Sequence, residues 1–161
     1  MAAVPDALMV LNHRLEDYLT KHISEFCSNG YTSDAENHCA HFVSHVKSYT
    51  FGYTCKGAMG GTGQAANLRV HEVFGRCREV GLFSDRGNVT ECLAFVTKST
   101  GVNVNNKSMA NIPKKHIGIY SLGSIYHYSN SRHKVWKDTP DEFAQHYTGD
   151  GFQVYYGTFP L

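Results

Sequence analysis

The first thirty residues carry apolar side chains at helical spacing. These positions recur every three or four residues, at Leu8, Leu11, Leu15, Leu19, Ile23 and Phe26. Steps of this size place side chains on one face of an α-helix. Asp6 is a candidate N-cap, and Asn29 with Gly30 provides a stop signal. The pattern therefore predicts an amphipathic helix within residues 1–30 that packs against the rest of the protein.

Two further helices are predicted before the middle of the chain. The segment 38–48 has three apolar residues at helical spacing, and Asn37 before it is a candidate N-cap. Cys39 is therefore expected in the first turn of this helix. Apolar residues at the same period predict another helix over 65–80, closed by Gly81.

The second half of the chain changes from helical spacing to short runs rich in β-branched and aromatic residues. The predicted strands are 92–97, 116–120, 124–129, 133–137 and 152–159, and they form one antiparallel sheet. The segment 139–147 predicts one short helix before the last strand. The Asn-rich loop 98–115 is expected either to be mobile or to form a wall of a binding site.

The composition fits one globular domain of 161 residues. Hydrophobic residues make up 42% of the chain and charged residues 18%, which is enough apolar surface for a core and too little charge for disorder. The predicted fold class is α+β. Its parts are the N-terminal helix in 1–30, the two helices in 31–81, and the antiparallel sheet of about five strands in 91–161.

Charge and hydropathy exclude several partners. The formal net charge is +1, so no strong field attracts nucleic acid. No apolar stretch approaches the length of a membrane span, and the N-terminus lacks the pattern of a signal peptide. The expectation is a chain made in the cytoplasm, with no nucleic-acid partner and no membrane span.

Ten histidines and five cysteines are the unusual feature of the composition. The cysteines are odd in number and show no CxxC spacing, so neither a dense disulfide framework nor a structural zinc knuckle is expected. Cys27, Cys77 and Cys92 lie on apolar faces and are interpreted as small buried hydrophobes, while Cys55 stays undecided.

Metal and nucleotide sites are not favoured. His41 and His45 are four residues apart and could share a metal, but the HExxH arrangement is absent, and hydrogen-bonded or surface histidines are the preferred interpretation. The Gly-rich segment 57–63 lacks the Lys and Ser/Thr of a phosphate-binding loop and is interpreted as a connector. No metal and no cofactor are predicted.

Cys39 has a chemically specific setting. A thiol in the first turn of a helix faces unpaired amides and the positive end of the helix dipole, which should lower its pKa and make it a nucleophile. Such a nucleophile needs a base and a group that orients the base. His116 and His127 lie on the two strands of a hairpin, where a three-residue loop would leave them one register step apart, so a small shift would bring both rings to one face.

The segments around these three residues are similar to a known family. Four segments resemble those of NlpC-type papain-like cysteine peptidases and amidases. They are NHCAHFVSHV at Cys39, the strand CLAFVT, the segment KKHIGIYSLGSIYHYS with His116 and His127, and the closing strand. The resemblance implies a papain-like fold with Cys39 as nucleophile, His116 as general base and acid, and His127 as the orienting residue. It also implies that Tyr31 and His38 border the oxyanion or substrate site.

The resemblance implies a hydrolase that cleaves amide bonds in the stem peptides or crosslinks of peptidoglycan. A single domain without a signal peptide is similar to bacterial amidase effectors exported by signal-independent secretion machines, or to phage-associated cell-wall hydrolases. The first of these implies an immunity or inhibitor protein as a further partner. Two alternatives stay open: an acyl or amide transferase on the same fold, and a non-catalytic protein or one that holds a metal through His41 and His45.

Overall fold

The computed structural model of the chain describes residues 6–49, 51, 55 and 68–160. The predicted connector 57–63 and the predicted start of the third helix lie outside the described residues. The helices are α1 (Asp6–Tyr18), α2 (Cys39–Lys47), α3 (Val70–Arg76) and α4 (Pro140–Ala144), with 3-10 turns η1 (Ile23–Glu25), η3 (Phe83–Asp85) and η4 (Ser99–Gly101). Among these described elements, none is long and apolar enough to cross a membrane.

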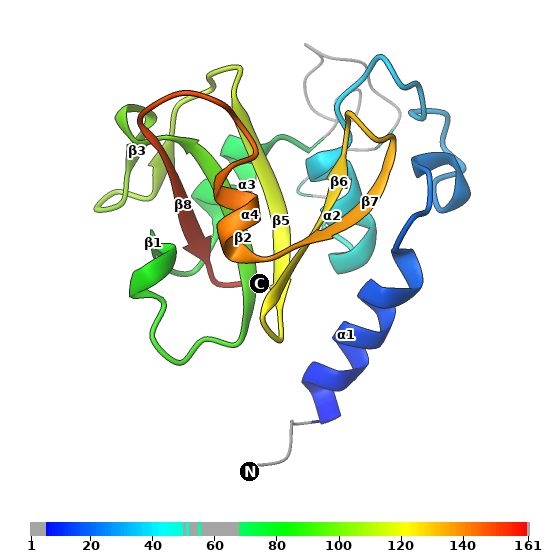
Figure 1. Cartoon of the computed structure of the whole chain (residues 1–161), viewed down its shortest axis with the longest axis horizontal. Coiled ribbons are helices and arrows are strands. Elements are labelled where there is room, and N and C mark those ends of the chain that lie inside the picture. Colours follow the sequence, from blue (N-terminus) through cyan, green and yellow to red (C-terminus); the bar gives the residue numbers. More distant parts are fainter. Residues whose placement is uncertain (1–5, 50, 52–54, 56–67, 161) are drawn as a thin grey trace.

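The architecture is α+β, as predicted, with the helices on both sides of an antiparallel sheet (Figure 1). The strands are β1 (Val80–Leu82), β2 (Glu91–Lys98), β3 (Val102–Asn103), β4 (Ser108–Met109), β5 (Lys115–Ser121), β6 (Ser124–Ser129), β7 (Lys134–Asp138) and β8 (Phe152–Gly157). Six of them form the main sheet in the order β1-β8-β2-β5-β6-β7, and β3 pairs with β4.

Two apolar clusters fill the two faces of the main sheet. The larger cluster joins α1, α2 and α3 to one face through residues such as Leu15, Phe42, Phe74 and Ile117. The smaller cluster lies on the opposite face, where Phe143 of α4 packs with side chains of β2, β5 and β6. Alternate residues of each strand therefore serve different cores, because successive side chains of a strand point to opposite faces.

The prediction of one helix through Phe26 is wrong, because the chain turns onto the sheet after Tyr18. Thr20 takes a left-handed conformation with φ 66°. Its N–H donates to the Val135 carbonyl at 2.9 Å, and the Val135 N–H donates to the Lys21 carbonyl at 3.0 Å. These bonds satisfy part of the open edge of β7, which favours an extended segment at residues 20–21 over further helix.

The helix predicted over 65–80 also ends earlier than its apolar residues indicated. It ends at Arg76, and the chain then forms β1, which pairs with β8. Gly81 lies in this strand and does not close a helix; a Cβ there would stand 2.9 Å from the Tyr156 ring, which would have to shift to accept it. The predicted loop 98–115 contains η4 and the β3–β4 pair.

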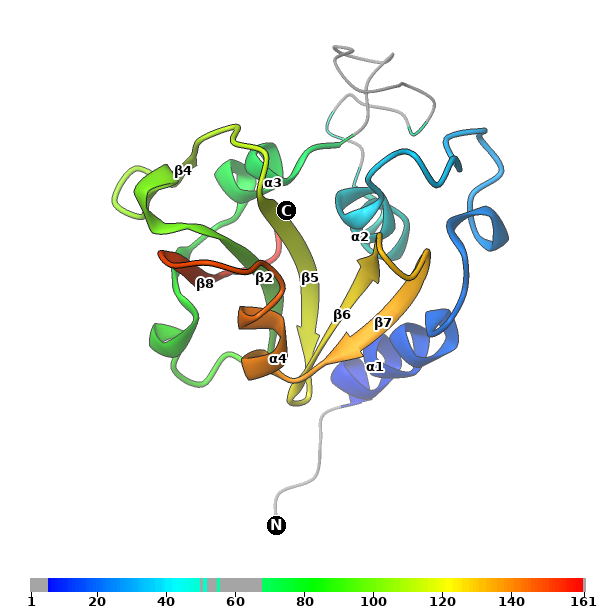
Figure 2. The ribbon, with the colours of Figure 1, turned by 45° about the horizontal axis from the view of Figure 1, so that its top comes forward.

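The β5–β6 hairpin has a two-residue loop in place of the predicted three-residue loop. Leu122 and Gly123 have φ 49° and 93°, and Ser121 pairs with Ser124. Positive φ at both central residues is the pattern of the tight turn that matches strand twist. The register therefore shifts by one residue from the prediction. Figure 2 shows the strands separating away from this turn, and α2 packs against both.

Candidate functional site

The register shift brings His116 and His127 to the same face of the sheet, as the site prediction required. Nε2 of His116 lies 2.8 Å from Nδ1 of His127, and Nε2 of His127 lies 2.8 Å from Oδ2 of Asp138. Both histidines are buried, and their rings pack against Phe143 of α4. Three polar side chains therefore form one hydrogen-bonded row across β5, β6 and β7.

The row fixes the proton positions. The Asp138 carboxylate only accepts, so the nitrogen of His127 that faces it carries the proton. In neutral His127 the other nitrogen is then an acceptor, and it receives the Nε2–H of His116. Nδ1 of His116 is left with a lone pair, and it has no hydrogen-bond partner among the described residues. General base catalysis requires such a lone pair within hydrogen-bond reach of the proton that it takes.

The neutral imidazole is the favoured state of His116 and of its neighbour His146. Burial, followed by the charges of His127 and His146, holds the pKa of His116 well below its usual range. His146 stacks on the His116 ring with centroids 3.9 Å apart and planes at 8°. Burial and the His127 charge lower the pKa of His146 to about 4. His116 is therefore an uncharged imidazole in the folded chain at neutral pH.

His116, His127 and His146 have ring nitrogens within 4.8 Å of one another, which makes them a candidate metal site. Two nitrogens on one zinc ion lie about 3.3 Å apart, given Zn–N bonds of about 2.0 Å at tetrahedral angles. The 2.8 Å between His116 and His127 is shorter and matches a hydrogen bond. The stacked rings of His116 and His146 also direct their lone pairs in parallel planes. The arrangement is a hydrogen-bonded relay.

Cys39 is the first residue of α2, as predicted, and its thiol is free. The expected fall in its pKa is wrong. The amides of Ile117 and Ala40 favour the thiolate, but the side chain is 2% exposed, and burial raises the pKa of Cys39 to about 11. Asn37, the predicted N-cap, accepts the Cys39 N–H through Oδ1 at 3.2 Å, although His38 holds the N-cap position.

Cys39 packs against β5, in the larger apolar cluster. One of the amides that act on its sulfur belongs to Ile117, the residue directly after His116. The Cys39 charge also contributes to the raised pKa of Tyr147, whose ring packs on His146 at 4.7 Å. Cys39 packs with Ile117 in the larger cluster, whereas His116 packs with Phe143 of the smaller cluster, so the thiol and the relay lie on opposite faces of β5. No hydrogen bond joins it to Nδ1 of His116 among the described residues.

Tyr31 and His38, the predicted oxyanion or substrate residues, gather around His41. The Tyr31 ring lies 5.0 Å from the His38 ring and 5.2 Å from the His41 ring, and its hydroxyl donates to Glu36 at 3.3 Å. His38 uses both ring nitrogens, one toward the Ser33 carbonyl at 2.7 Å and one toward His41 at 3.0 Å. His38 therefore has no ring N–H left for an oxyanion.

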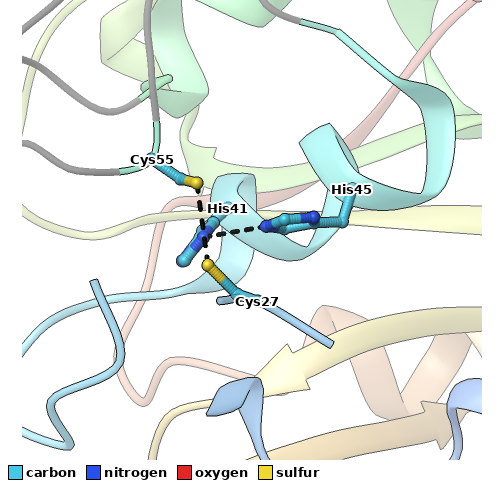
Figure 3. A group of neighbouring side chains, drawn as sticks. All are labelled: Cys27, His41, His45 and Cys55. Atoms are coloured by element: carbon cyan, nitrogen blue, oxygen red, sulfur yellow. Dashed lines mark hydrogen bonds between the residues drawn. The ribbon is translucent and has the colours of Figure 1, made fainter. Parts of the chain in front are cut away.

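A second cluster, formed by Cys27, His41, His45 and Cys55, brings four ligand atoms within 4.8 Å of one another (Figure 3). Cys27 follows η1, and both histidines lie on α2. The sulfurs are 3.6 Å apart, and the two Nε2 atoms are 3.2 Å apart. Burial lowers the pKa of His41 to about 3 and lowers that of His45, so both rings are neutral. The sequence interpretation of His41 and His45 as hydrogen-bonded or surface residues therefore did not predict that they meet Cys27 and Cys55.

The sequence offered only partial signals for the residues it missed. The spacing of His41 and His45 was visible, but Cys27 and Cys55 are too far along the chain to suggest a ligand pair. Asp138 joins the relay because Ile125 pairs with Asp138 and His127 with Trp136, which makes Asp138 a diagonal neighbour of His127. Cys77 and Cys92 are buried in the cores, as predicted.

Comparison with known proteins identifies no relative: no family model, no curated protein and no solved structure matches this chain. The resemblance to NlpC-type enzymes therefore rests on the motifs around Cys39, His116 and His127.

Proposed function

We propose that this protein is a cysteine hydrolase of amide bonds, with Cys39 as nucleophile and His116 as general base and acid. The observation that supports this most is the relay from Asp138 through His127 to His116, which leaves a buried lone pair on Nδ1 of His116. Cys39 opens a helix and packs at the amide of Ile117, the residue after His116, so the reaction requires the thiol to reach Nδ1 of His116 from the other face of β5. A nucleophile, a base and an orienting group are the parts that covalent catalysis requires.

The proposed reaction has two halves. Nδ1 of His116 takes the thiol proton while Sγ of Cys39 bonds to the substrate carbonyl carbon, giving a tetrahedral oxyanion. The intermediate collapses, the C–N bond breaks, and His116 returns the proton to the leaving amine. A water molecule, deprotonated by His116, then attacks the acyl-enzyme, and the C–S bond breaks to release the acid and the Cys39 thiol.

The charge state of the site determines how the thiol is activated. Cys39 has a pKa of about 11, and the pKa of His116 lies well below its usual range, so the resting pair is thiol and neutral imidazole. Proton transfer must therefore accompany attack on the carbonyl. The imidazolium that forms donates to His127, which donates to Asp138, so the new positive charge is shared with a carboxylate.

The substrate class and the papain-like arrangement come from the resemblance. It favours the peptide amides of peptidoglycan, in the stem peptide or the crosslink. An oxyanion would be stabilised by amides at the start of α2. His38 does not take part in this proposal, because both of its ring nitrogens bond within the protein.

The test is to incubate the protein with purified peptidoglycan and identify the released fragments by mass spectrometry. Cys39→Ala should abolish release, and His116→Ala should reduce it by about 100-fold or more, the range of general acid–base catalysis. His13→Ala is the matched control, since His13 is an exposed residue of α1 and should leave release unchanged. Full turnover by folded Cys39→Ala would refute the mechanism.

A further inference from the structure

We propose that Cys27, His41, His45 and Cys55 bind one zinc ion in a structural site. The proposal does not depend on the proposed hydrolase function, because none of the four residues belongs to the relay or is the nucleophile. Two thiols and two imidazoles form a ligand set that zinc takes up in proteins, in tetrahedral geometry. Figure 3 shows the four side chains pointing toward one another from three separate parts of the chain.

The distances match a tetrahedron around zinc. Zn–S bonds of about 2.3 Å and Zn–N bonds of about 2.0 Å at tetrahedral angles place the two sulfurs about 3.8 Å apart and the two nitrogens about 3.3 Å apart. The observed values are 3.6 Å between the sulfurs of Cys27 and Cys55, and 3.2 Å between the Nε2 atoms of His41 and His45. The sulfur pair and the nitrogen pair thus have the separations of a zinc site, and all four ligand atoms lie within 4.8 Å of one another.

A chain of hydrogen bonds fixes His41 in the tautomer that a metal requires. Nε2 of His38 donates to the Ser33 carbonyl, which can only accept. Nδ1 of neutral His38 is then an acceptor, so Nδ1 of His41, 3.0 Å away, carries the proton. The lone pair of His41 is thereby placed on Nε2, the atom that faces His45 and the thiols. Metal-binding histidines are commonly held by such an outer partner.

The sulfurs also have the donors that thiolates need. The side-chain amide of Asn29 donates to the sulfur of Cys55 at 2.8 Å, and the Asn29 backbone amide donates to the sulfur of Cys27. Two thiolates balance the charge of one Zn²⁺, so the partly buried site carries no net charge. The Phe26 ring covers one side of His45, with centroids 5.8 Å apart. Charge and environment therefore suit a bound ion.

Four protein ligands leave no open coordination position, which is the property of a structural zinc site. The ion would join the segment after η1, the helix α2 and the residue Cys55. Cys39 lies on the same helix, two residues before His41. The zinc ion would thus hold the helix that presents Cys39 to β5.

The first experiment measures metal in the purified wild-type protein. The protein is expressed in medium with zinc and purified under reducing conditions, and its zinc content is measured by inductively coupled plasma mass spectrometry. We expect about one zinc ion per chain. Refolding with Co²⁺ should give the intense visible bands of a tetrahedral site and a thiolate-to-cobalt charge-transfer band. These readouts do not require activity, so a failed hydrolase assay and a failed zinc site are distinguishable.

Variants then assign the ligands. Cys27→Ser and Cys55→Ser should each lower the zinc content and weaken the charge-transfer band, while the matched control Cys39→Ser keeps both. If the variants do not fold, titration of the wild-type protein with a chelator still decides, since removal of the ion should lower the thermal midpoint. Absence of zinc together with absence of the cobalt bands, or a Cys27–Cys55 disulfide in the reduced preparation, would overturn the proposal.

Discussion

Replacing Gly118 by alanine tests the geometry that aligns the relay. A Cβ at this position would lie 2.7 Å from Cγ2 of Ile125, 2.8 Å from the carbonyl oxygen of Tyr126 and 3.1 Å from Cβ of His127. Carbon atoms in contact lie at about 3.5–4.0 Å, so β6 has to move by about 0.5–1 Å. Because one of the three contacts is a backbone oxygen, side-chain rotation does not relieve the overlap.

We expect Gly118→Ala to lower the free energy of unfolding by about 1–3 kcal/mol, the usual range for overpacking. The displacement also lengthens the 2.8 Å bond between His116 and His127, since it pushes on His127 directly. Urea unfolding followed by circular dichroism measures the first effect, and nitrogen-15 NMR of the imidazoles measures the second.

Gly75→Ala is the matched control for this substitution. Gly75 is an exposed residue of α3, and a Cβ there would meet only the Lys107 carbonyl oxygen at 3.6 Å, an ordinary contact. Alanine is the better helix former, so this variant should be as stable as the wild type or more stable. Equal unfolding free energies for Gly118→Ala and the wild type would refute the strand register described above.

Three further predictions follow from the site and the hairpin. The free energy of unfolding should decrease as pH falls below about 6.5, by up to about 1.4 kcal/mol per pH unit for each of His116 and His146. Both residues have lowered pKa values in the folded chain, so the unfolded chain binds protons first. Urea titrations across pH 4.5–7 measure this decrease, and His146→Gln should make it less steep. Leu122→Asn should raise the free energy of unfolding by about 0.5–1 kcal/mol, because asparagine tolerates the positive φ of this exposed turn position better than leucine does. A lower thermal midpoint for the variant would contradict this prediction. Asp138→Asn should lower the kcat of the proposed reaction by up to about 100-fold with little change in KM, because His127 keeps an acceptor but loses its negative partner; an unchanged kcat would remove Asp138 from the relay.

The helix α2 carries both candidate sites. Cys39 stands at its first turn and faces β5, while His41 and His45 lie one turn apart and face the segment after η1. The periodicity of this nine-residue helix thus places the proposed nucleophile and the proposed metal ligands on different sides of it.

The sequence by itself determined the type of most elements. The strands β2, β5, β6, β7 and β8 and the helix α2 match the predicted segments to within one or two residues. These elements follow from local periodicity and from stop signals within a few residues of each end, which the chain carries regardless of its fold. Cys39 at a helix start belongs to this group, since the cue lies in the neighbouring residues.

The tertiary structure decided what depends on distant residues. The first helix ends early because residues 20–21 bond to Val135, and the thiol of Cys39 has a raised pKa because the folded chain buries it. Asp138 reaches His127 through strand pairing, and Cys27 meets Cys55 across 28 positions of the chain. Burial and contact between distant residues arise only when the chain has packed. The elements could therefore be predicted from the sequence, whereas the relay and the four-ligand cluster required the fold.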